Sequence, residues 1–226
     1  MLRRLLQLYI GLVLYGVSTA LFVHANLGAD PWDVFHLGVA KQLGISFGTV
    51  IILTGAAVLL LWIPIRQMPG LGTVSNVIVL GLAADATLAV LPPLESMVAR
   101  SALLVGAIVL NAIATGMYIG AGFGPGPRDG LMTGLHARTG WSLRGIRTAI
   151  ELSVLLIGWL LGGKFGVGTV IYALSIGPLI QLCLPWFSQP VSRNAVSPPR
   201  EIVSSINPSP SSSRRGPFIA YRPLRP

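Results

Sequence analysis

The chain has 226 residues, of which 53% are hydrophobic and only 10% are charged, and its mean hydropathy is +0.74. A soluble domain carries about 25% charged residues, so this composition excludes an ordinary soluble domain and predicts an all-α integral membrane protein. The formal net charge of +9 is explained by arginines in cytoplasmic loops and by attraction of a basic tail to anionic lipid. No nucleic-acid-binding motif accompanies this charge, so no nucleic-acid partner is expected.

Six apolar stretches are long enough to cross the hydrocarbon core of a bilayer, which needs about 20 residues. They are residues 5–23, 47–65, 72–91, 102–120, 143–161 and 168–187. The first follows Arg3 and Arg4, but it is too long for the apolar core of a signal peptide and five more spans follow it. We therefore interpret it as a retained transmembrane helix.

Lysine and arginine in short loops mark the cytoplasmic side of a membrane protein. Arginines precede the first span, follow the second, surround the loop between the fourth and fifth, and recur in the tail. All of them fall on one side if both termini are cytoplasmic. The other side then keeps only Lys41, Arg100 and Lys164 as cations. This distribution predicts a multi-pass protein with both termini in the cytoplasm.

The apolar region repeats itself at an offset of 96 residues. Gly28 matches Gly124, Pro31 matches Pro127 and Asp33 matches Asp129, and further on Gly72 matches Gly168 and Thr73 matches Thr169. The matched residues are those that shape the backbone rather than common apolar ones, which indicates a duplication. We assign residues 1–96 and 97–187 to the two copies. Because each copy holds three spans, an odd number, the sequence predicts two inverted three-helix repeats.

Each predicted repeat contains a short helix after its first span. In "GADPWD", Asp30 is a good N-cap residue and Pro31 suits the first helical position, and "GPGPRD" repeats this layout with Pro127. Helices over residues 31–43 and 127–139 are too short to cross a bilayer. Each is either an interfacial amphipathic helix or a re-entrant half-helix. A re-entrant helix would aim its positive N-terminus at an anionic group of a substrate.

Charged residues at the starts of these helices are candidates for a substrate path. Asp33 and Asp129 either cap their helices or line such a path. Arg128 stands where the first copy has Trp32, so the shared fold does not require it. It is a candidate ligand contact or, equally, a topology signal.

Three polar residues inside the spans are also candidates for the substrate path. Asp85 and Gln181 are related by the offset of 96 residues, and Asn111 lies in the fourth span. Ionisable groups at membrane depth are costly and are functional candidates by default. These three either form hydrogen bonds between helices or line the path of a solute or proton. Glu151, which has no polar counterpart, is expected to pair with Arg147 one turn earlier.

Two further sequence features are interpreted as structural. The runs "RQMPGLGT" and "GKFGVGT" predict a tight turn closed by a threonine hydroxyl, and they do not match the phosphate-binding loop pattern. Trp62, Trp141 and Trp186 stand near the ends of spans, which is typical of anchors at the membrane interface.

Sequence motifs of enzymes are not found in the chain, and its histidines are scattered. We therefore expect no enzyme, no cofactor and no metal site. Residues 188–226 are rich in Ser, Pro and Arg and too poor in apolar residues to form a core. They are predicted to be a disordered cytoplasmic tail.

The stretch "ANLGADPWDVFHLGVA", with "GISFGTV" and "WIPIRQMPGLGT" after it, resembles the YczE/YyaS/YitT-like family of bacterial integral membrane proteins, and within it the YczE branch. The resemblance covers about residues 3–187. Its motif falls on Asn26, Gly28, Asp30, Pro31, Trp32, Asp33, Gly38, Arg66, Pro69, Gly70, Gly72 and Thr73. It implies a multi-pass protein of the bacterial cytoplasmic membrane, and it carries over no catalytic residue.

The paired helix starts and paired polar positions favour a permease-like protein that moves a small solute or ion. Six helices with short loops enclose little volume, so a homodimer within the lipid bilayer is expected. The alternative is a non-transporting accessory or scaffold protein that assists another membrane or biosynthetic enzyme, since a structural duplication need not transport anything.

Overall fold

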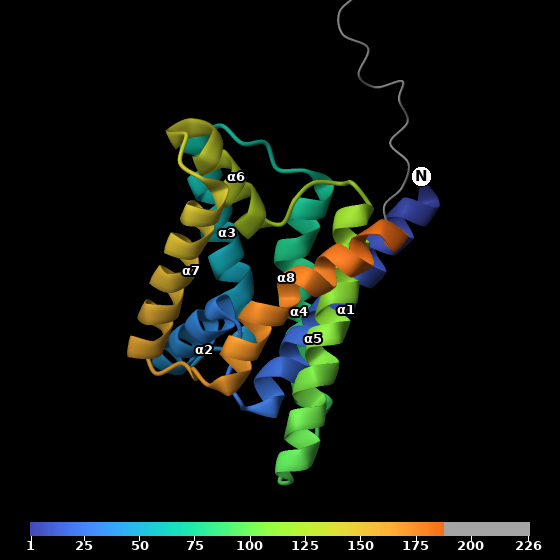
Figure 1. Ribbon diagram of the computed structural model, residues 1–226, viewed down its shortest axis with the longest axis vertical. Coiled ribbons are helices and arrows are strands. Elements are labelled where there is room, and N and C mark those ends of the chain that lie inside the picture. Colours follow the sequence, from blue (N-terminus) through green and yellow to red (C-terminus); the bar gives the residue numbers. More distant parts are fainter. Residues whose placement is uncertain (188–226) are drawn as a thin grey trace, which may run out of the picture. The chain divides into compact units, whose positions relative to one another are not determined.

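The computed structural model describes residues 1–187, and the predicted tail over residues 188–226 lies outside the described residues. In the described part the chain forms eight α-helices and no strand (Figure 1). They are α1 (Leu2–Ala25), α2 (Pro31–Leu43), α3 (Phe47–Ile65), α4 (Leu71–Val90), α5 (Met97–Gly120), α6 (Pro127–Thr139), α7 (Leu143–Leu160) and α8 (Val167–Phe187). The all-α prediction and the two short helices are confirmed.

Five of these helices, α1, α3, α4, α5 and α8, are long and apolar enough to cross a membrane. The sequence predicted six such spans, and α7 is the one that differs. It has 18 residues, but Arg144, Arg147 and Glu151 place three charged side chains in its first half. These charges make α7 less apolar than the other five long helices.

The helix boundaries follow from local capping chemistry. Asp30 accepts the backbone amide of Asp33 at 2.7 Å, and Pro31 opens α2 as the sequence predicted. Ser46 accepts the amide of Thr49 at the start of α3. Asn26 ends α1 in the left-handed conformation, with φ of 54°. These three helix ends are thus closed by residues suited to their turns.

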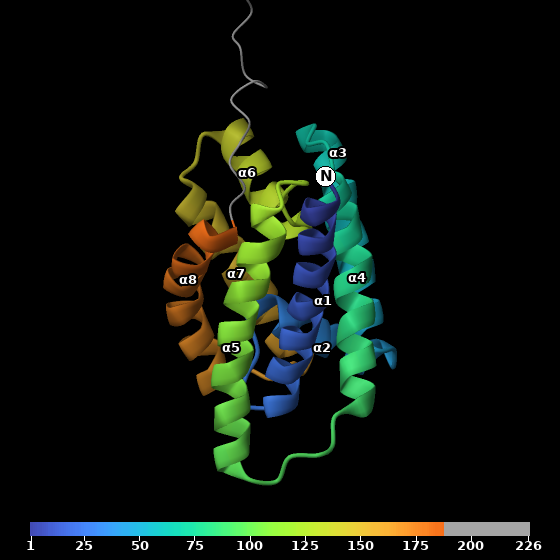
Figure 2. The same cartoon turned by 90° about the vertical axis from the view of Figure 1, so that its right-hand side faces the viewer.

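Helices α1 and α5 pack against each other, with α4 on α1 and α8 on α5 (Figure 2). The short helices are exchanged between the halves, because α2 packs on α7 and α6 packs on α3. Each half of the chain therefore completes its packing with elements of the other.

Several hydrogen bonds that join the halves occur in pairs separated by 96 residues. Arg4 Nε donates to the carbonyl of Ala121 at 2.9 Å, and Arg100 Nε donates to that of Ala25 at 2.8 Å. Likewise the amide of Gly72 donates to Phe123 at 2.9 Å, and the amide of Gly168 donates to Leu27 at 2.8 Å. The loop before each short helix is therefore held by the opposite half of the chain.

Glycine is required at the centre of both of these loops. Gly28 and Gly124 have φ angles of 113° and 114°, a region that side chains disfavour. A Cβ atom at either position would also lie 2.8 Å from the threonine hydroxyl of the other half, Thr169 or Thr73. The conformation and the close approach both explain this part of the motif.

The two halves differ in how their last two helices pack. Helix α4 lies along α3, and the backbones of Gly48 and Gly81 meet there. Within residues 1–187 no comparable interface joins α7 and α8, because α7 packs on α2 instead. Figure 1 shows α7 standing apart from α8.

A large residue and a small one stand at equivalent positions where α3 and α7 meet the short helices. Gly158 on α7 lies directly against the backbone of Phe35, where a Cβ atom would overlap. Its counterpart on α3 is Trp62, which is 2% exposed, packs on Gly130 and donates its indole Nε1 to Pro127 at 3.1 Å. The expectation of an interface anchor at Trp62 is wrong, because its indole finds an acceptor inside the protein.

Candidate functional site: a central polar cavity

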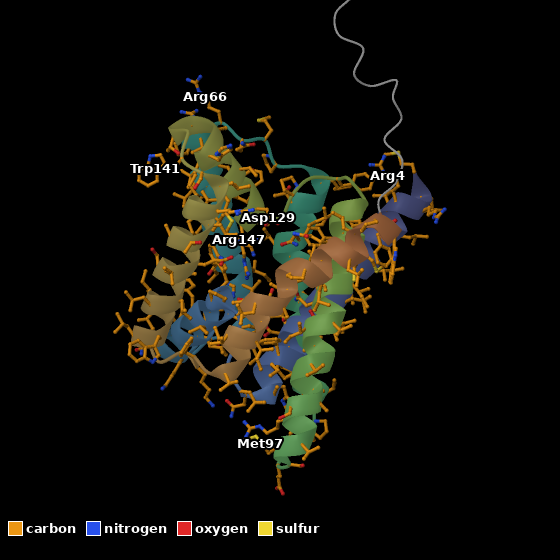
Figure 3. All side chains as sticks on the ribbon, viewed as in Figure 1. Arg4, Arg66, Met97, Asp129, Trp141 and Arg147 are labelled. Carbon is orange, nitrogen blue, oxygen red and sulfur yellow. The ribbon has the colours of Figure 1, made fainter. Side chains whose placement is uncertain are left out.

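A cavity of about 250 Å³ lies inside the helical domain, and all eight helices contribute to its lining. The first turns of both short helices reach it, through Asp30 to Trp32 on one side and Gly126 to Asp129 on the other. Asp129 and Arg147, which are exposed, also line the cavity and lie near each other in Figure 3. The cavity therefore has an opening near the starts of α6 and α7.

Helix α2 begins in the interior of the protein and ends at its surface. Asp30, Asp33 and His36 are between 1 and 6% exposed, whereas the last three residues of the helix are exposed. A helix lying flat in the interface would bury one face along its whole length. The burial of α2 favours the re-entrant alternative.

An ion cluster connects the starts of the two short helices. Arg128 Nη1 lies 3.5 Å from Asp30 Oδ2, and Nη2 lies 3.9 Å from Asp33 Oδ1. The guanidinium also lies over the ring of Trp32, 4.9 Å from its centroid. Arg128 is therefore a half-buried contact between the two halves of the chain.

The protonation of this cluster is set mainly by burial. Loss of solvent raises the pKa of Asp33 to about 7, although Arg128 opposes the shift. Burial and the positive charge of Arg128 lower the pKa of His36 to about 3. His36 is thus neutral near pH 7, and its Nδ1 lies 3.3 Å from Asp33 Oδ1.

Two buried polar atoms on the cavity wall have no hydrogen-bond partner within residues 1–187. They are the indole Nε1 of Trp32 and the hydroxyl of Thr115, and both side chains are 6% exposed. Buried polar groups are nearly always paired in proteins. These two atoms are free to bind water or a polar group of a ligand.

The α6 and α7 side of the cavity is also charged. Asp129 accepts a hydrogen bond from the Tyr118 hydroxyl at 3.0 Å. Arg147 donates to Glu151 at 2.8 Å, the pair that the sequence spacing predicted. Among residues 1–187, no group of three or more His, Cys, Asp or Glu side chains could hold a metal ion.

The predicted substrate-path residues divide into two groups. Arg128 and Asp129 line the cavity, and Asp33 contacts Arg128 beside it. Asn111 donates to Ser18 at 2.9 Å and accepts from Tyr172, a cavity residue, at 3.3 Å. Asn111 on α5 therefore forms hydrogen bonds to α1 and α8, which agrees with the first of the two interpretations given above.

Asp85 and Gln181 do not line this cavity. Asp85 accepts the amide of Gly48 at 2.6 Å and the hydroxyl of Ser46 at 2.5 Å, so it caps α3. Gln181 is exposed on α8. The offset of 96 residues relates Asp85 to Gln181, but within the described part of the chain the two side chains form no shared polar centre, because Asp85 is bound to the start of α3 and Gln181 has no corresponding contact between α7 and α8.

The glycine and threonine motif residues hold loops in place. The hydroxyl of Thr73 accepts the amide of Gly70 at 3.2 Å and donates to the carbonyl of Pro125 at 2.7 Å. Thr169 accepts the amide of Gly166 at 3.3 Å in the same way. These are the predicted tight turns with hydroxyl caps. Asn26 accepts a hydrogen bond from Lys164 at 2.6 Å.

Sequence reasoning missed His36, Tyr118 and Tyr172 as members of the cavity wall. The repeat could have indicated Tyr172, because its counterpart 96 residues earlier is the polar residue Asn76. Both residues line the cavity. A tyrosine inside an apolar span also brings a hydroxyl that needs a partner.

Comparisons with known proteins agree with a membrane protein of this kind. A family of unknown function, DUF6198, matches residues 2–185. An uncharacterised protein of Haemophilus influenzae is 38% identical over 177 residues, which are 78% of this chain and 81% of the relative. YczE, an uncharacterised membrane protein of Bacillus subtilis, is 30% identical over 78% of this chain and 83% of its own length.

YyaS, an uncharacterised protein of the same species, is 23% identical over 78% of this chain and 90% of its own length. No solved structure matches the chain. The family match covers all eight helices except the last two residues of α8. The resemblance to YczE and YyaS is confirmed. The chain therefore belongs to the DUF6198 family of YczE/YyaS-like proteins.

Proposed function

We propose that this membrane protein is permease-like and moves a small solute or ion through its central cavity. The observation that carries the proposal is the cavity itself, which has charged and polar groups on a partly apolar wall, lies where the two halves meet and receives the N-termini of two short helices. Transporters built from inverted repeats place their binding sites at such a junction. Ligand sites in general combine apolar walls with a few polar groups that converge.

The paired hydrogen bonds support two inverted repeats, α1, α3 and α4 followed by α5, α7 and α8. Gln7 near the start of α1 donates to the carbonyl of Phe187 at the end of α8, at 3.0 Å. The two ends of the helical domain thus lie together. An even number of crossings brings both ends to one side, whereas five would separate them. We therefore count α7 as a sixth crossing.

The arginine distribution supports an orientation for these crossings. Arg4 and Arg66 lie toward one end of the domain and Met97 at the other in Figure 3. The positive-inside rule would place the Arg4 and Arg66 end in the cytoplasm. The opening near Asp129 and Arg147 would then face the cytoplasmic side.

The unequal packing of the halves supports an alternating-access cycle. Asp85 closes α4 on α3, whereas its counterpart Gln181 lies free of the α7 start at Ser142. In an inverted repeat, the opposite state arises when the two halves exchange conformations. In that state Gln181 would cap α7 as Asp85 caps α3, and the opening would move to the other side.

The proposal is tested by asking whether the cavity opens to both sides of the membrane. Thr54→Cys in a Cys183→Ser background places one thiol on the cavity wall. A permease should react with a membrane-impermeant methanethiosulfonate reagent in both right-side-out and inside-out vesicles. The matched control is Gly106→Cys, on the exposed face of α5, which should react in neither.

Reaction of Thr54→Cys from one side only would contradict transport and favour the non-transporting accessory protein. A second test concerns the exchange of conformations. Ser142→Cys with Gln181→Cys should form a disulfide under mild oxidation, although α7 and α8 are not packed together here. The pair Ser142→Cys with Trp186→Cys should not, because Trp186 lies about one and a half turns beyond Gln181 on α8.

A further inference from the structure

The cluster of Asp30, Asp33 and Arg128 has an unbalanced charge. Two carboxylates face one guanidinium, at 3.5 Å and 3.9 Å. His36 contacts Asp33 but is neutral near pH 7, because burial lowers its pKa to about 3. If both acids are ionised, one negative charge has no partner. We call Asp30 and Asp33 the acid pair.

Other groups around the cavity do not supply the missing positive charge. Arg147 on α7 is hydrogen-bonded to Glu151 on its own helix, and Asp129 on α6 adds a further carboxylate. Helices α1, α5 and α8 contribute the tyrosine hydroxyls of Tyr15, Tyr118 and Tyr172. The cavity residues of α3 and α4 include no charged side chain. The described residues therefore leave the acid pair with Arg128 as its sole cation.

Burial makes this imbalance costly. The side chains of Asp30 and Asp33 are 9% and 3% exposed. A buried carboxylate without a partner takes up a proton in preference to staying charged. Loss of solvent and repulsion from Asp33 raise the pKa of Asp30 as well. A single proton on the pair leaves one carboxylate for Arg128 and restores neutrality.

We propose that the acid pair is a proton-binding site, which holds one exchangeable proton near neutral pH and exchanges it with water in the cavity. Asp30 lines the cavity, and Asp33 lies about one turn further along α2, beside His36. The proton passes from cavity water to a carboxylate oxygen, and its release returns the pair to two carboxylates. Arg128, which also lies over Trp32, then has two anionic partners instead of one.

This proton site deepens the proposed function, on which the coupling of the proton to a solute rests. The binding of the proton itself does not require transport. A proton can therefore be detected on the acid pair even if Thr54→Cys reacts from one side of the membrane only. The two experiments thus distinguish failure of the proton site from failure of the proposed transport.

Infrared difference spectroscopy of the full chain in liposomes measures the proton directly. The carbonyl stretch of a protonated carboxyl should disappear as the pH is raised from 5 to 9, with an amplitude of about one carboxyl per chain. Aspartate labelled with carbon-13 at the side-chain carboxyl should shift this band without any substitution. Since labelling leaves the fold unchanged, this result does not depend on whether variants fold.

Substitutions then assign the band to the acid pair. Asp33→Asn should remove it, and so should Asp30→Asn, because a single carboxylate beside Arg128 stays ionised. The exposed Glu95→Gln variant should keep it. Absence of an isotope-sensitive band between pH 5 and 9 overturns the proposal, as does a band that survives in both Asn variants.

The remaining outcome concerns a metal cation in place of the proton. The titration is repeated in sodium chloride, potassium chloride and choline chloride. A proton site titrates alike in all three. If sodium or potassium removes the band at constant pH and choline does not, a metal cation displaces the proton, and the proton is overturned as the occupant of the site in the presence of that salt.

Discussion

The carboxylate of Asp85 on α4 accepts a hydrogen bond from the backbone amide of Gly48 on α3 at 2.6 Å. Its second oxygen accepts the hydroxyl of Ser46, which is the N-cap residue of α3. An acid at this position satisfies an orphan amide and also interacts favourably with the positive end of the helix dipole. One side chain thereby caps α3 and fastens it to α4.

Replacing Asp85 with alanine should therefore weaken the α3–α4 interface. Loss of hydrogen bonds to a charged group costs about 1–3 kcal/mol, so we expect a clear fall in the thermal unfolding midpoint of the protein in detergent. Glu95→Gln removes an exposed acid in the α4–α5 connection and should leave the midpoint unchanged. Equal midpoints for both variants would show that Asp85 does not stabilise this interface.

Gly158→Ala should disrupt the packing of α2 on α7. The added Cβ atom would overlap the backbone of Phe35, and relief requires the two helices to move apart. Overpacking of this kind costs about 1–3 kcal/mol. Gly177→Ala is the matched control, because a Cβ atom there meets nothing within 4 Å. Unfolding midpoints compare the two, and a Gly158→Ala variant as stable as Gly177→Ala would argue against this close contact.

Arg128 and Asp30 should be energetically coupled across the two halves. Their atoms are 3.5 Å apart and the Arg128 side chain is 24% exposed, so solvent screens the pair only in part. In a double-mutant cycle with Arg128→Gln and Asp30→Asn, we expect a coupling free energy of about 1–3 kcal/mol. The double variant should be more stable than the sum of the single losses implies. Strict additivity would mean that the ion pair contributes nothing.

Stability should decrease as the pH rises from about 4 to 7. Asp33 has a pKa of about 7 in the folded protein against an ordinary value of 3.8. Between these values the folded chain binds a proton that the unfolded chain has lost, so raising the pH favours unfolding. Above pH 7 this contribution is constant. Unfolding midpoints between pH 5 and 8 should show the trend, and Asp33→Asn should flatten it while Glu95→Gln does not.

The proposed topology places the α4–α5 connection outside the cell. Glu95 and Arg66 are exposed residues of the connections on the two sides of α4. In a Cys183→Ser background, Glu95→Cys should react with an impermeant maleimide in intact cells. Arg66→Cys should react only after the cells are opened. The reverse pattern would invert the orientation, and labelling of both in intact cells would contradict the crossing by α4.

Much of the fold could be predicted because its signals are local. The boundaries of α2 and α6 follow from Asp30, Pro31 and Pro127, and the predicted bounds of both helices are those observed. The predicted homodimer and cytoplasmic termini stay predictions. The crossing by α7 was predicted from its length, although Arg147 and Glu151 make it the least apolar of the long helices.

The site was predicted less well because it depends on packing between halves. Arg128 differs from its counterpart Trp32, and that difference identified it as a candidate. Its contact with Asp30 could not be read from the sequence, since it requires α2 and α6 to be exchanged between the halves. Asp85 and Gln181 stand at equivalent positions, yet only Asp85 has a helix start beside it. Equivalence in sequence therefore did not ensure equivalence in contact.

The exchanged loops have a consequence for the order of assembly. The carbonyl of Leu27 is bound by the amide of Gly168, a residue that the ribosome adds 141 positions later. Until α8 has been synthesised, the loop before α2 lacks this partner, and a chain truncated before α8 would leave the carbonyl of Leu27 without it. We therefore expect the first three membrane helices to reach their final packing only after α8 has been synthesised. Nascent chains should accordingly become resistant to protease in one late step, and the first half should not become resistant before the second.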